Sequence, residues 1–160
     1  MGADLNKIKD AGLAGVLSLF IGVLVAFIMG VIIAYSLGYT DAVSLTTIGA
    51  GACTYIVGPV TGGALGASSE VLAISIAAGV IKTLVVTVMT PLIADRISLH
   101  NAKSAVVFGG LMGTTSGVAA GLAATDPELV PYGAMTATFY TGLGCLLCPS
   151  ILYYLVSVIF

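Results

Sequence analysis

The sequence has very little charge. Only 12 of its 160 residues are charged, 5 Lys and Arg against 7 Asp and Glu. A soluble domain carries roughly a quarter charged residues, and a nucleic-acid-binding protein needs a basic patch that a net charge of -2 does not supply. Together with a mean hydropathy of +1.16, this shortage excludes a soluble enzyme, a disordered tail and a partner for nucleic acid. It indicates an integral membrane protein in contact with membrane lipid.

Metal ligands and catalytic groups are also scarce. The chain has one histidine, His100, and three cysteines, Cys53, Cys145 and Cys148, all three inside apolar stretches. Two nearby thiols are too few ligands for a metal site, so we interpret the cysteines as small apolar fillers. No residues are spaced as a nucleophile and its base, and neither an enzyme nor a bound cofactor is predicted.

Charged residues divide the chain into five apolar segments. They cover about residues 11–36, 43–67, 69–94, 104–124 and 132–160. The first, third and fifth are long enough to cross a bilayer as helices, and tyrosines at both ends of the fifth are typical of membrane interfaces. The predicted fold is therefore an all-α integral membrane protein with about three spanning helices.

The second and fourth segments differ from the other three because glycine and hydroxyl residues dominate them. Gly58-Pro59 interrupts the second, and backbone of this kind is tolerated at membrane depth only where protein or a cavity surrounds it. We expect broken or re-entrant helices. The alternative is one straight, tightly packed helix, because Gly109, Gly113, Gly117 and Gly121 form a small-residue ridge.

The basic residues outside the apolar segments favour a re-entrant second segment. They lie only in the N-terminal tail, at Lys7 and Lys9, and in the loop with Arg96 and Lys103. If both places are cytoplasmic, an even number of crossings separates them. A re-entrant hairpin at 43–67 leaves two crossings.

The last 120 or so residues contain a possible repeat. Thr46-Thr47-Ile48-Gly49 resembles Thr114-Thr115-Ser116-Gly117, and the spans from Glu70 to Pro91 and from Glu128 to Pro149 align without a gap. We interpret 1–160 as a single transmembrane domain with a leading helix (1–36) and two repeat units (43–94 and 104–160). Units of opposite topology are a known transporter arrangement, with substrate and ion bound near the midplane.

Lys82 is the most informative single residue. It lies near the middle of the third segment, about 18 Å from either end, and a cation at that depth faces a partner, a cavity or a substrate. We predict that it attracts a carboxylate. The alternative is a fixed salt bridge with Glu70 or Asp41.

Hydroxyl residues supply the rest of the predicted site. Hydroxyls and backbone carbonyls suit a hard cation such as Na⁺, and helix N-termini suit carboxylates. The alternative for any single hydroxyl is a bond to its own helix. The predicted substrate-binding residues are Lys82, Thr46, Thr47, Thr114, Thr115 and Ser116, and the predicted ion-binding residues are Ser44, Thr54, Thr61 and Thr138. Thr136 and Thr141 are also placed to line a path.

The runs 11–27, 39–71 and 108–150 resemble the MadM subunit of bacterial malonate:sodium symporters, and they cover most of the chain. The resemblance implies a secondary transporter of the bacterial inner membrane that imports malonate with Na⁺ as the coupling ion. It also implies a small partner subunit, MadL. Chains of this family are longer, so this one looks like their C-terminal part with Met1 as a new start.

Two other functions stay open at this point. One is a non-transporting structural or assembly part of a membrane complex. The other is a holin-like membrane protein, to which the glycine-rich layout is loosely similar. Lys82 favours the transporter, because a pore-former needs no cation at mid-depth. Association of the chain into a homo-oligomer also stays open.

Overall fold

The computed structural model describes residues 4–160, which are helical with no β-strand among them. Three helices are long and apolar enough to cross a membrane: Leu5–Ser36, Ser69–Ile93 and Pro127–Ile159. The predicted all-α membrane fold with three spanning helices is confirmed. The prediction that Met1 is a new start concerns a residue outside the described range.

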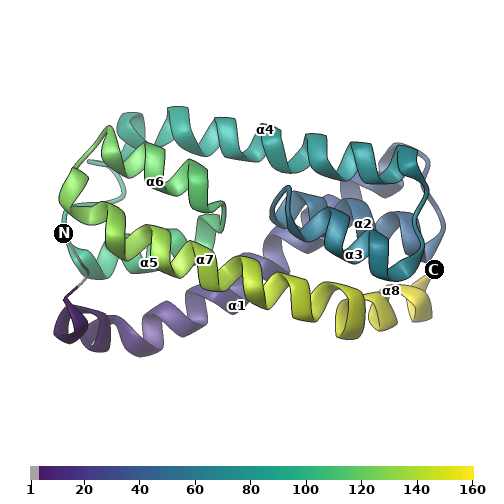
Figure 1. Cartoon of the computed structure of the whole chain (residues 1–160), viewed down its shortest axis with the longest axis horizontal. Coiled ribbons are helices and arrows are strands. Elements are labelled where there is room, and N and C mark those ends of the chain that lie inside the picture. Colours follow the sequence, from purple (N-terminus) through teal and green to yellow (C-terminus); the bar gives the residue numbers. More distant parts are fainter. Residues whose placement is uncertain (1–3) are drawn as a thin grey trace. The chain divides into compact units, whose positions relative to one another are not determined.

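The chain order of the elements is shown in Figure 1. They are α1 (Leu5–Ser36), α2 (Ala42–Cys53), α3 (Val57–Leu65), α4 (Ser69–Ile93), α5 (Ala102–Met112), α6 (Thr115–Ala123), the 3-10 turn η1 (Pro127–Leu129), α7 (Val130–Leu147), the π-helical turn η2 (Cys148–Leu152) and α8 (Tyr153–Ile159).

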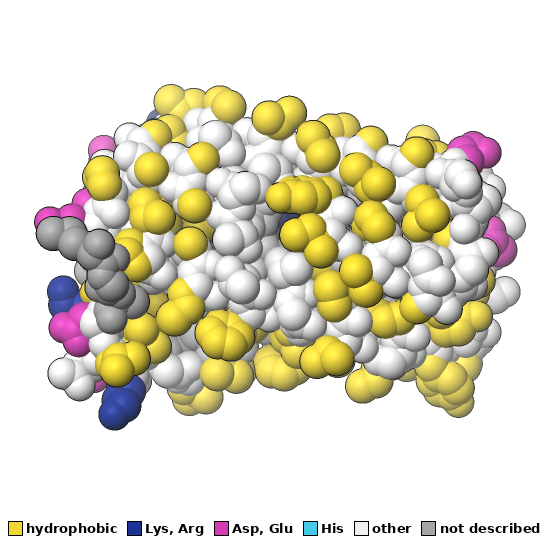
Figure 2. Space-filling view, viewed as in Figure 1, with side chains coloured by type: hydrophobic (Ala, Val, Ile, Leu, Met, Phe, Trp, Pro, Cys, Tyr) yellow, Lys and Arg dark blue, Asp and Glu magenta, His cyan; other side chains and the backbone are white. Residues whose placement is uncertain are grey.

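The long helices expose apolar side chains, as contact with lipid requires. On α1, Leu13, Phe20 and Ile28 are about half exposed or more, and only a third of its most apolar window is buried. Hydrophobic side chains are spread over the whole visible face in Figure 2. Exposing this surface to water would be costly, whereas the lipid chains of a bilayer are a suitable environment for it.

Two compact units share the long helices between them. Unit 1 holds α5 and α6 together with the chain up to Gly22, the part of α4 from Lys82 onward, and α7 as far as Tyr140. Unit 2 holds α2 and α3 together with Val23–Ile81 and Thr141–Phe160. Each unit therefore combines one pair of short helices with parts of all three long helices.

In unit 2 the short helices α2 and α3 form an antiparallel pair. A Cβ placed on Gly58 would lie 2.9 Å from Cα of Gly51, and one placed on Gly62 would lie 2.7 Å from the Thr47 methyl. Because the residue numbers of the contacting residues rise along α3 while they fall along α2, the two helices are antiparallel and the chain reverses between them. It reverses at Thr54–Ile56, before Gly58-Pro59, which lies in the first turn of α3. The sequence had suggested a break at that dipeptide, but proline is tolerated in a first turn, where its missing N–H is not needed.

In unit 1 the short helices α5 and α6 are separated by Gly113 and Thr114. Gly113 has φ +73° and ends α5 with its N–H bonded to the Gly109 carbonyl. Such left-handed backbone is routine for glycine. A Cβ on Gly133 of α7 would contact both Leu122 of α6 and the Ala105 carbonyl of α5, so the outer ends of the two helices meet. The alternative of one straight helix along the glycine ridge is wrong. Whether either pair is re-entrant in a membrane stays a prediction.

The two helix pairs can be matched to each other by their caps and reversals. This match differs from the one that the sequence motifs suggest. Asp41 accepts a hydrogen bond from the Ser44 N–H at the start of α2, as Asn101 does from the Ser104 N–H at the start of α5. Thr54 and Thr114 then follow the two helices at the reversals. The motif at Thr46–Gly49 lies inside α2, before a reversal, whereas Thr114–Gly117 follows one. The two motifs thus lie at different places in their helix pairs, and the repeat units themselves stay a prediction.

Candidate functional site

Lys82 lies beside a buried tyrosine of unit 1. Its Nζ donates a hydrogen bond to the Tyr140 hydroxyl at 3.3 Å and lies 5.0 Å from the centre of the same ring. The Tyr140 hydroxyl in turn donates to the Gly22 carbonyl at 3.2 Å. Tyr140 is fully buried and Lys82 is partly buried. In this hydrogen bond the ammonium is held by a neutral acceptor, and the face of the same ring lies close to it.

The reversal between α5 and α6 packs against the same tyrosine. A Cβ on Gly113 would overlap the Tyr140 ring, so the bare Cα of Gly113 lies directly on that ring. Glycine is required here for two reasons, the positive φ and the close approach. The contact places the N-terminal end of α6 in the same cluster as Tyr140 and Lys82.

α4 and α6 meet through their threonines. The hydroxyl oxygens of Thr83 and Thr114 lie 2.6 Å apart, and a Cβ on Gly117 would lie 2.9 Å from the Thr83 carbonyl oxygen. Because its hydroxyl is engaged with Thr83, Thr114 makes no side-chain cap to α6. The first N–H groups of a helix carry a partial positive charge, and here no cap from Thr114 covers them.

The predicted substrate residues of unit 1 fall near this reversal. Thr114 is buried, Thr115 is partly exposed and Ser116 is exposed on the first turn of α6. The hydroxyl of Thr115 lies 3.5 Å from that of Thr138 on α7, and Thr138 also donates to the Ala134 carbonyl. Thr136 is buried and bonded to its own helix at the Tyr132 carbonyl.

The remaining predicted residues lie in unit 2 and do not form one cluster. Ser44 is in the first turn of α2, about 15 Å of helix from Thr54 at the reversal. Thr47 donates to the Val43 carbonyl at 2.7 Å, while Thr54 accepts from the N–H groups of Ile56 and Val57. The remaining two residues, Thr46 and Thr61, are fully buried. The assignment of substrate and ion residues stays a prediction.

The carboxylates considered as partners of Lys82 have local roles. Asp41 caps α2, and Tyr39 donates to Glu70 at 3.4 Å. Burial acts to raise the pKa of Asp41, but hydrogen bonds from Ser44 and neighbouring N–H groups hold it below its usual value. Glu70 lies in the first turn of α4, about 18 Å of helix from Lys82, which is too long for a direct ion pair.

Sequence reasoning missed Tyr140, Thr83 and Gly113. A signal for Tyr140 existed, because it follows Glu128 at the same distance at which Lys82 follows Glu70, within the spans that align without a gap. That correspondence marked a tyrosine and a lysine at matching places of two long helices. It did not show that the two side chains touch.

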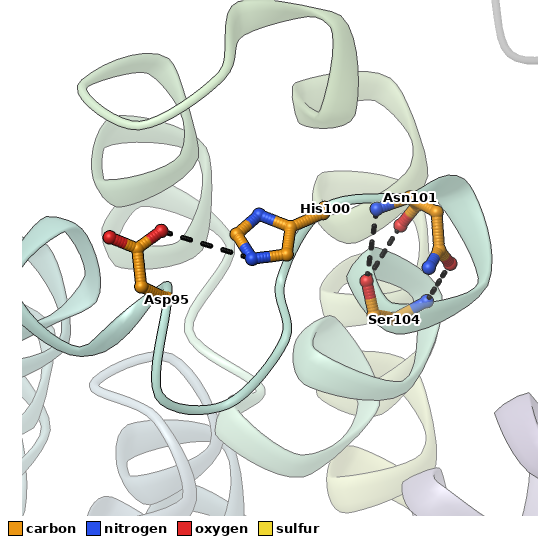
Figure 3. A network of polar contacts seen from close by, with 4 residues as sticks. All are labelled: Asp95, His100, Asn101 and Ser104. Atoms are coloured by element: carbon orange, nitrogen blue, oxygen red, sulfur yellow. Dashed lines mark hydrogen bonds and ion pairs between the residues drawn. The ribbon is translucent and has the colours of Figure 1, made fainter.

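A polar hollow of about 620 Å³ opens on the surface of unit 1. His100 is one of the residues that line this hollow, and its Nε2 is 3.8 Å from an Asp95 carboxylate oxygen. Asn101 and Ser104 form the cap of α5 beside it (Figure 3). No group of three or more His, Cys, Asp or Glu side chains in residues 4–160 is placed to hold a metal ion. The lining includes both charge signs, at Lys7, Asp10, Lys103, Asp126 and Glu128, together with His100.

Comparison with known proteins identifies one family. The sequence model described as the malonate/sodium symporter MadM subunit matches residues 1–160. Neither the curated proteins nor the solved structures contain a match. The family match is therefore the only finding of these comparisons that bears on function.

Proposed function

Because the chain belongs to the MadM family of malonate/sodium symporter subunits, we propose that it takes part in Na⁺-coupled malonate import and binds the anion at Lys82. The observation that carries this proposal is the ammonium of a membrane-spanning helix held by the neutral Tyr140 hydroxyl. A carboxylate is the natural stronger partner, because two opposite full charges attract each other more strongly than a charge attracts a neutral hydroxyl.

Binding at this place replaces one acceptor by another. In the unliganded arrangement Lys82 donates to the Tyr140 hydroxyl. An arriving carboxylate takes over that hydrogen bond, and the Tyr140 hydroxyl keeps its bond to the Gly22 carbonyl. Tyr140 thus holds the ammonium in position between binding events without competing as a charged ligand would.

Malonate has two carboxylates, and the start of α6 suits the second. The first turn of α6 offers N–H groups without a cap from Thr114, together with the hydroxyls of Thr115 and Ser116. A helix N-terminus is a ready anion site. The same cluster thereby provides one full positive charge and one partial charge, which matches a dicarboxylate better than a monocarboxylate.

We place this multi-pass protein in the bacterial inner membrane, with the small subunit MadL as its partner for transport. Three long apolar helices support the membrane location, and the family description supports malonate and Na⁺ as the transported species. Self-association is part of the same proposal and is tested by the mass of the purified protein in detergent.

The test measures malonate binding and malonate uptake separately. In detergent, malonate at about 100 times its Kd raises the free energy of unfolding of the wild type by about 2.7 kcal/mol, and we expect Lys82→Ala to abolish that gain. In proteoliposomes with a Na⁺ gradient, we expect the same variant to reduce uptake of labelled malonate at least ~10-fold. Lys103→Ala is the matched control, because this lysine is exposed in the same unit.

Two outcomes contradict the proposal. In the first, Lys82→Ala keeps the full malonate-dependent stabilisation. In the second, Lys103→Ala loses as much as Lys82→Ala, which indicates a general effect of net charge. Adding MadL to the vesicles separates a chain that needs its partner for uptake from one that does not bind malonate.

A further inference from the structure

Two threonine hydroxyls in unit 2 have no hydrogen-bond partner anywhere in residues 4–160. They are Oγ1 of Thr46 on α2 and Oγ1 of Thr61 on α3, and both side chains are fully buried. Buried polar groups are nearly always hydrogen-bonded, and each exception calls for an explanation such as a water or an ion. Because both exceptions lie in one pair of short helices, we look for one explanation that covers both.

The neighbouring threonines show that this is not a general property of the helix pair. Thr47 bonds back to the Val43 carbonyl, and Thr54 accepts two backbone N–H groups at the reversal. A threonine in a helix commonly satisfies its hydroxyl by such a bond to its own backbone. Thr46 and Thr61 do not, so their oxygen lone pairs stay available.

The packing of α2 on α3 brings these two residues to nearly the same level of the pair. A Cβ on Gly62 would lie 2.7 Å from the Thr47 methyl, and Thr46 and Thr61 are the residues directly before Thr47 and Gly62 in the chain. In this antiparallel pair Thr46 and Thr61 are therefore offset by about 3 Å along the helix axes, on either side of a contact in which the helices approach closely because glycine lacks a side chain.

The charge of unit 2 suits a cation. All five Lys and Arg residues and His100 belong to unit 1, and the only ionisable carboxylates of unit 2 are Asp41 and Glu70. A cation in unit 2 thus meets no basic side chain of that unit. In unit 1 it would have to share the unit with Lys82.

From these observations we infer that the α2–α3 pair of unit 2 holds the coupling cation, Na⁺, with Thr46 and Thr61 as oxygen ligands. The inference rests on the proposed function, since it assigns the ion of that transport. Hydroxyl and backbone carbonyl oxygens are suitable ligands for a small hard cation, and interrupted helices commonly provide the carbonyls in transporters. Unit 1 then binds the anion and unit 2 the cation.

The experiment follows the thermal unfolding of the purified chain in detergent, without malonate, in NaCl and in choline chloride of equal ionic strength. We expect Na⁺ to raise the Tm of the wild type, because a ligand that binds only the folded state stabilises it. Thr46→Val and Thr61→Val should each lose most of that rise. In choline both variants should unfold at the wild-type Tm or above it, because valine removes an unpaired buried hydroxyl at nearly constant volume.

Matched variants keep this test independent of folding defects. Thr47→Val removes a hydroxyl that is already bonded, so it should keep the Na⁺ response. Thr46→Ser keeps the hydroxyl and should also keep the response. The inference is overturned if the wild type shows no specific response to Na⁺, or if Thr46→Val and Thr61→Val both retain it, which would indicate that the hydroxyls serve only water.

The outcome is distinguishable from failure of the proposed function. Lys82→Ala should keep the Na⁺ response while it loses the malonate response. A chain that responds to Na⁺ but never to malonate overturns the anion site and leaves the cation site standing. The opposite pattern overturns the cation site alone.

Discussion

Unit 1 and unit 2 are built from the same parts but carry different chemistry. Each combines two antiparallel short helices with parts of α1, α4 and the α7–α8 region. All Lys, Arg and His residues belong to unit 1, whereas unit 2 has only Asp41 and Glu70 as charged residues. The architecture alone therefore does not decide what is bound. The side chains within each unit differ, with Lys82 bonded to Tyr140 in unit 1 and two buried hydroxyls without a hydrogen-bond partner in the α2–α3 pair of unit 2, and the two proposed sites rest on this difference.

The reversals themselves also differ, and this difference has a structural consequence. In unit 2, Thr54 is extended and its hydroxyl accepts from the first N–H groups after the turn. In unit 1, Gly113 makes the turn in left-handed backbone, and Thr114 turns its hydroxyl to Thr83 instead. One reversal satisfies its own N–H groups with a side chain, and the other leaves the start of α6 without that cap. The proposed anion site relies on the second.

The largest effect on stability is expected from Gly113→Ala in unit 1. Alanine at a left-handed position costs about 1–2 kcal/mol, and its Cβ would also overlap the Tyr140 ring, which adds about 1–3 kcal/mol. Gly66→Ala in unit 2 is the matched control, because Gly66 has nearly the same φ and open space around it. Chemical denaturation in detergent should show a total loss of about 2–5 kcal/mol for Gly113→Ala and of only about 1–2 kcal/mol for Gly66→Ala.

Equal losses for these two variants would mean that the contact between Gly113 and Tyr140 contributes nothing. Gly113→Ala should in addition weaken malonate binding, because it displaces the tyrosine that positions Lys82. Gly66→Ala should leave malonate binding unchanged.

A smaller effect is expected where the short helices pack on the long ones through glycine. A Cβ on Gly109 would overlap Gly133 of α7 in unit 1, and a Cβ on Gly51 would overlap the Ser75 backbone of α4 in unit 2. We expect either Ala variant to lower the free energy of unfolding by about 1–3 kcal/mol through overpacking. Gly12→Ala and Gly63→Ala are the controls for the two units, since nothing lies near their side-chain positions.

Alanine at the control positions should be neutral or stabilising by about 0.5–1 kcal/mol, because it favours the helix over glycine. If Gly51→Ala and Gly109→Ala behave like these controls, close glycine packing does not hold either helix pair in place. If only one of them is costly, the two units differ in packing as well as in charge.

The spanning helices and the helical class could be predicted from sequence because runs of Leu, Ile and Val have one common solution in a bilayer. The reversal in unit 2 was expected at Gly58-Pro59 because that dipeptide is the strongest local breaker. The chain instead turns at Thr54, which has a side chain that can cap the next helix. Local breaker strength was a poorer guide than the ability to satisfy free N–H groups.

The site was predicted in part for a similar reason. Lys82 stood out because a lone charge at mid-depth is expensive. Tyr140 was marked only by its correspondence with Lys82 in the aligned spans, and nothing in a single sequence shows that these two side chains, 58 positions apart, touch each other. The unpaired hydroxyls of Thr46 and Thr61 were hidden among nine predicted hydroxyl ligands for the same reason. Only the packed structure shows which threonines bond to their own backbone.

The smallest expected effect compares the caps of α2 and α5. Asp41 and Asn101 each accept a hydrogen bond from a backbone N–H three residues on, and Asp41→Ala and Asn101→Ala should each cost about 1 kcal/mol at pH 7. The two caps differ in that only Asp41 titrates. Its pKa is below the usual value in the folded chain, so its contribution is present above the pKa of the unfolded state, about 3.9, and is lost as the pH falls through the folded value.

Unfolding in detergent at a series of pH values therefore separates the two units. The difference between wild type and Asp41→Ala should shrink as the pH falls below about 4, while the difference between wild type and Asn101→Ala stays constant. Asp41→Asn should keep the cap, because asparagine is an equally good acceptor there, and should no longer lose stability in acid through this site. If both differences respond to pH alike, the acid sensitivity comes from elsewhere in the chain. In that case the charge of unit 2 at the start of α2 does not contribute to its stability.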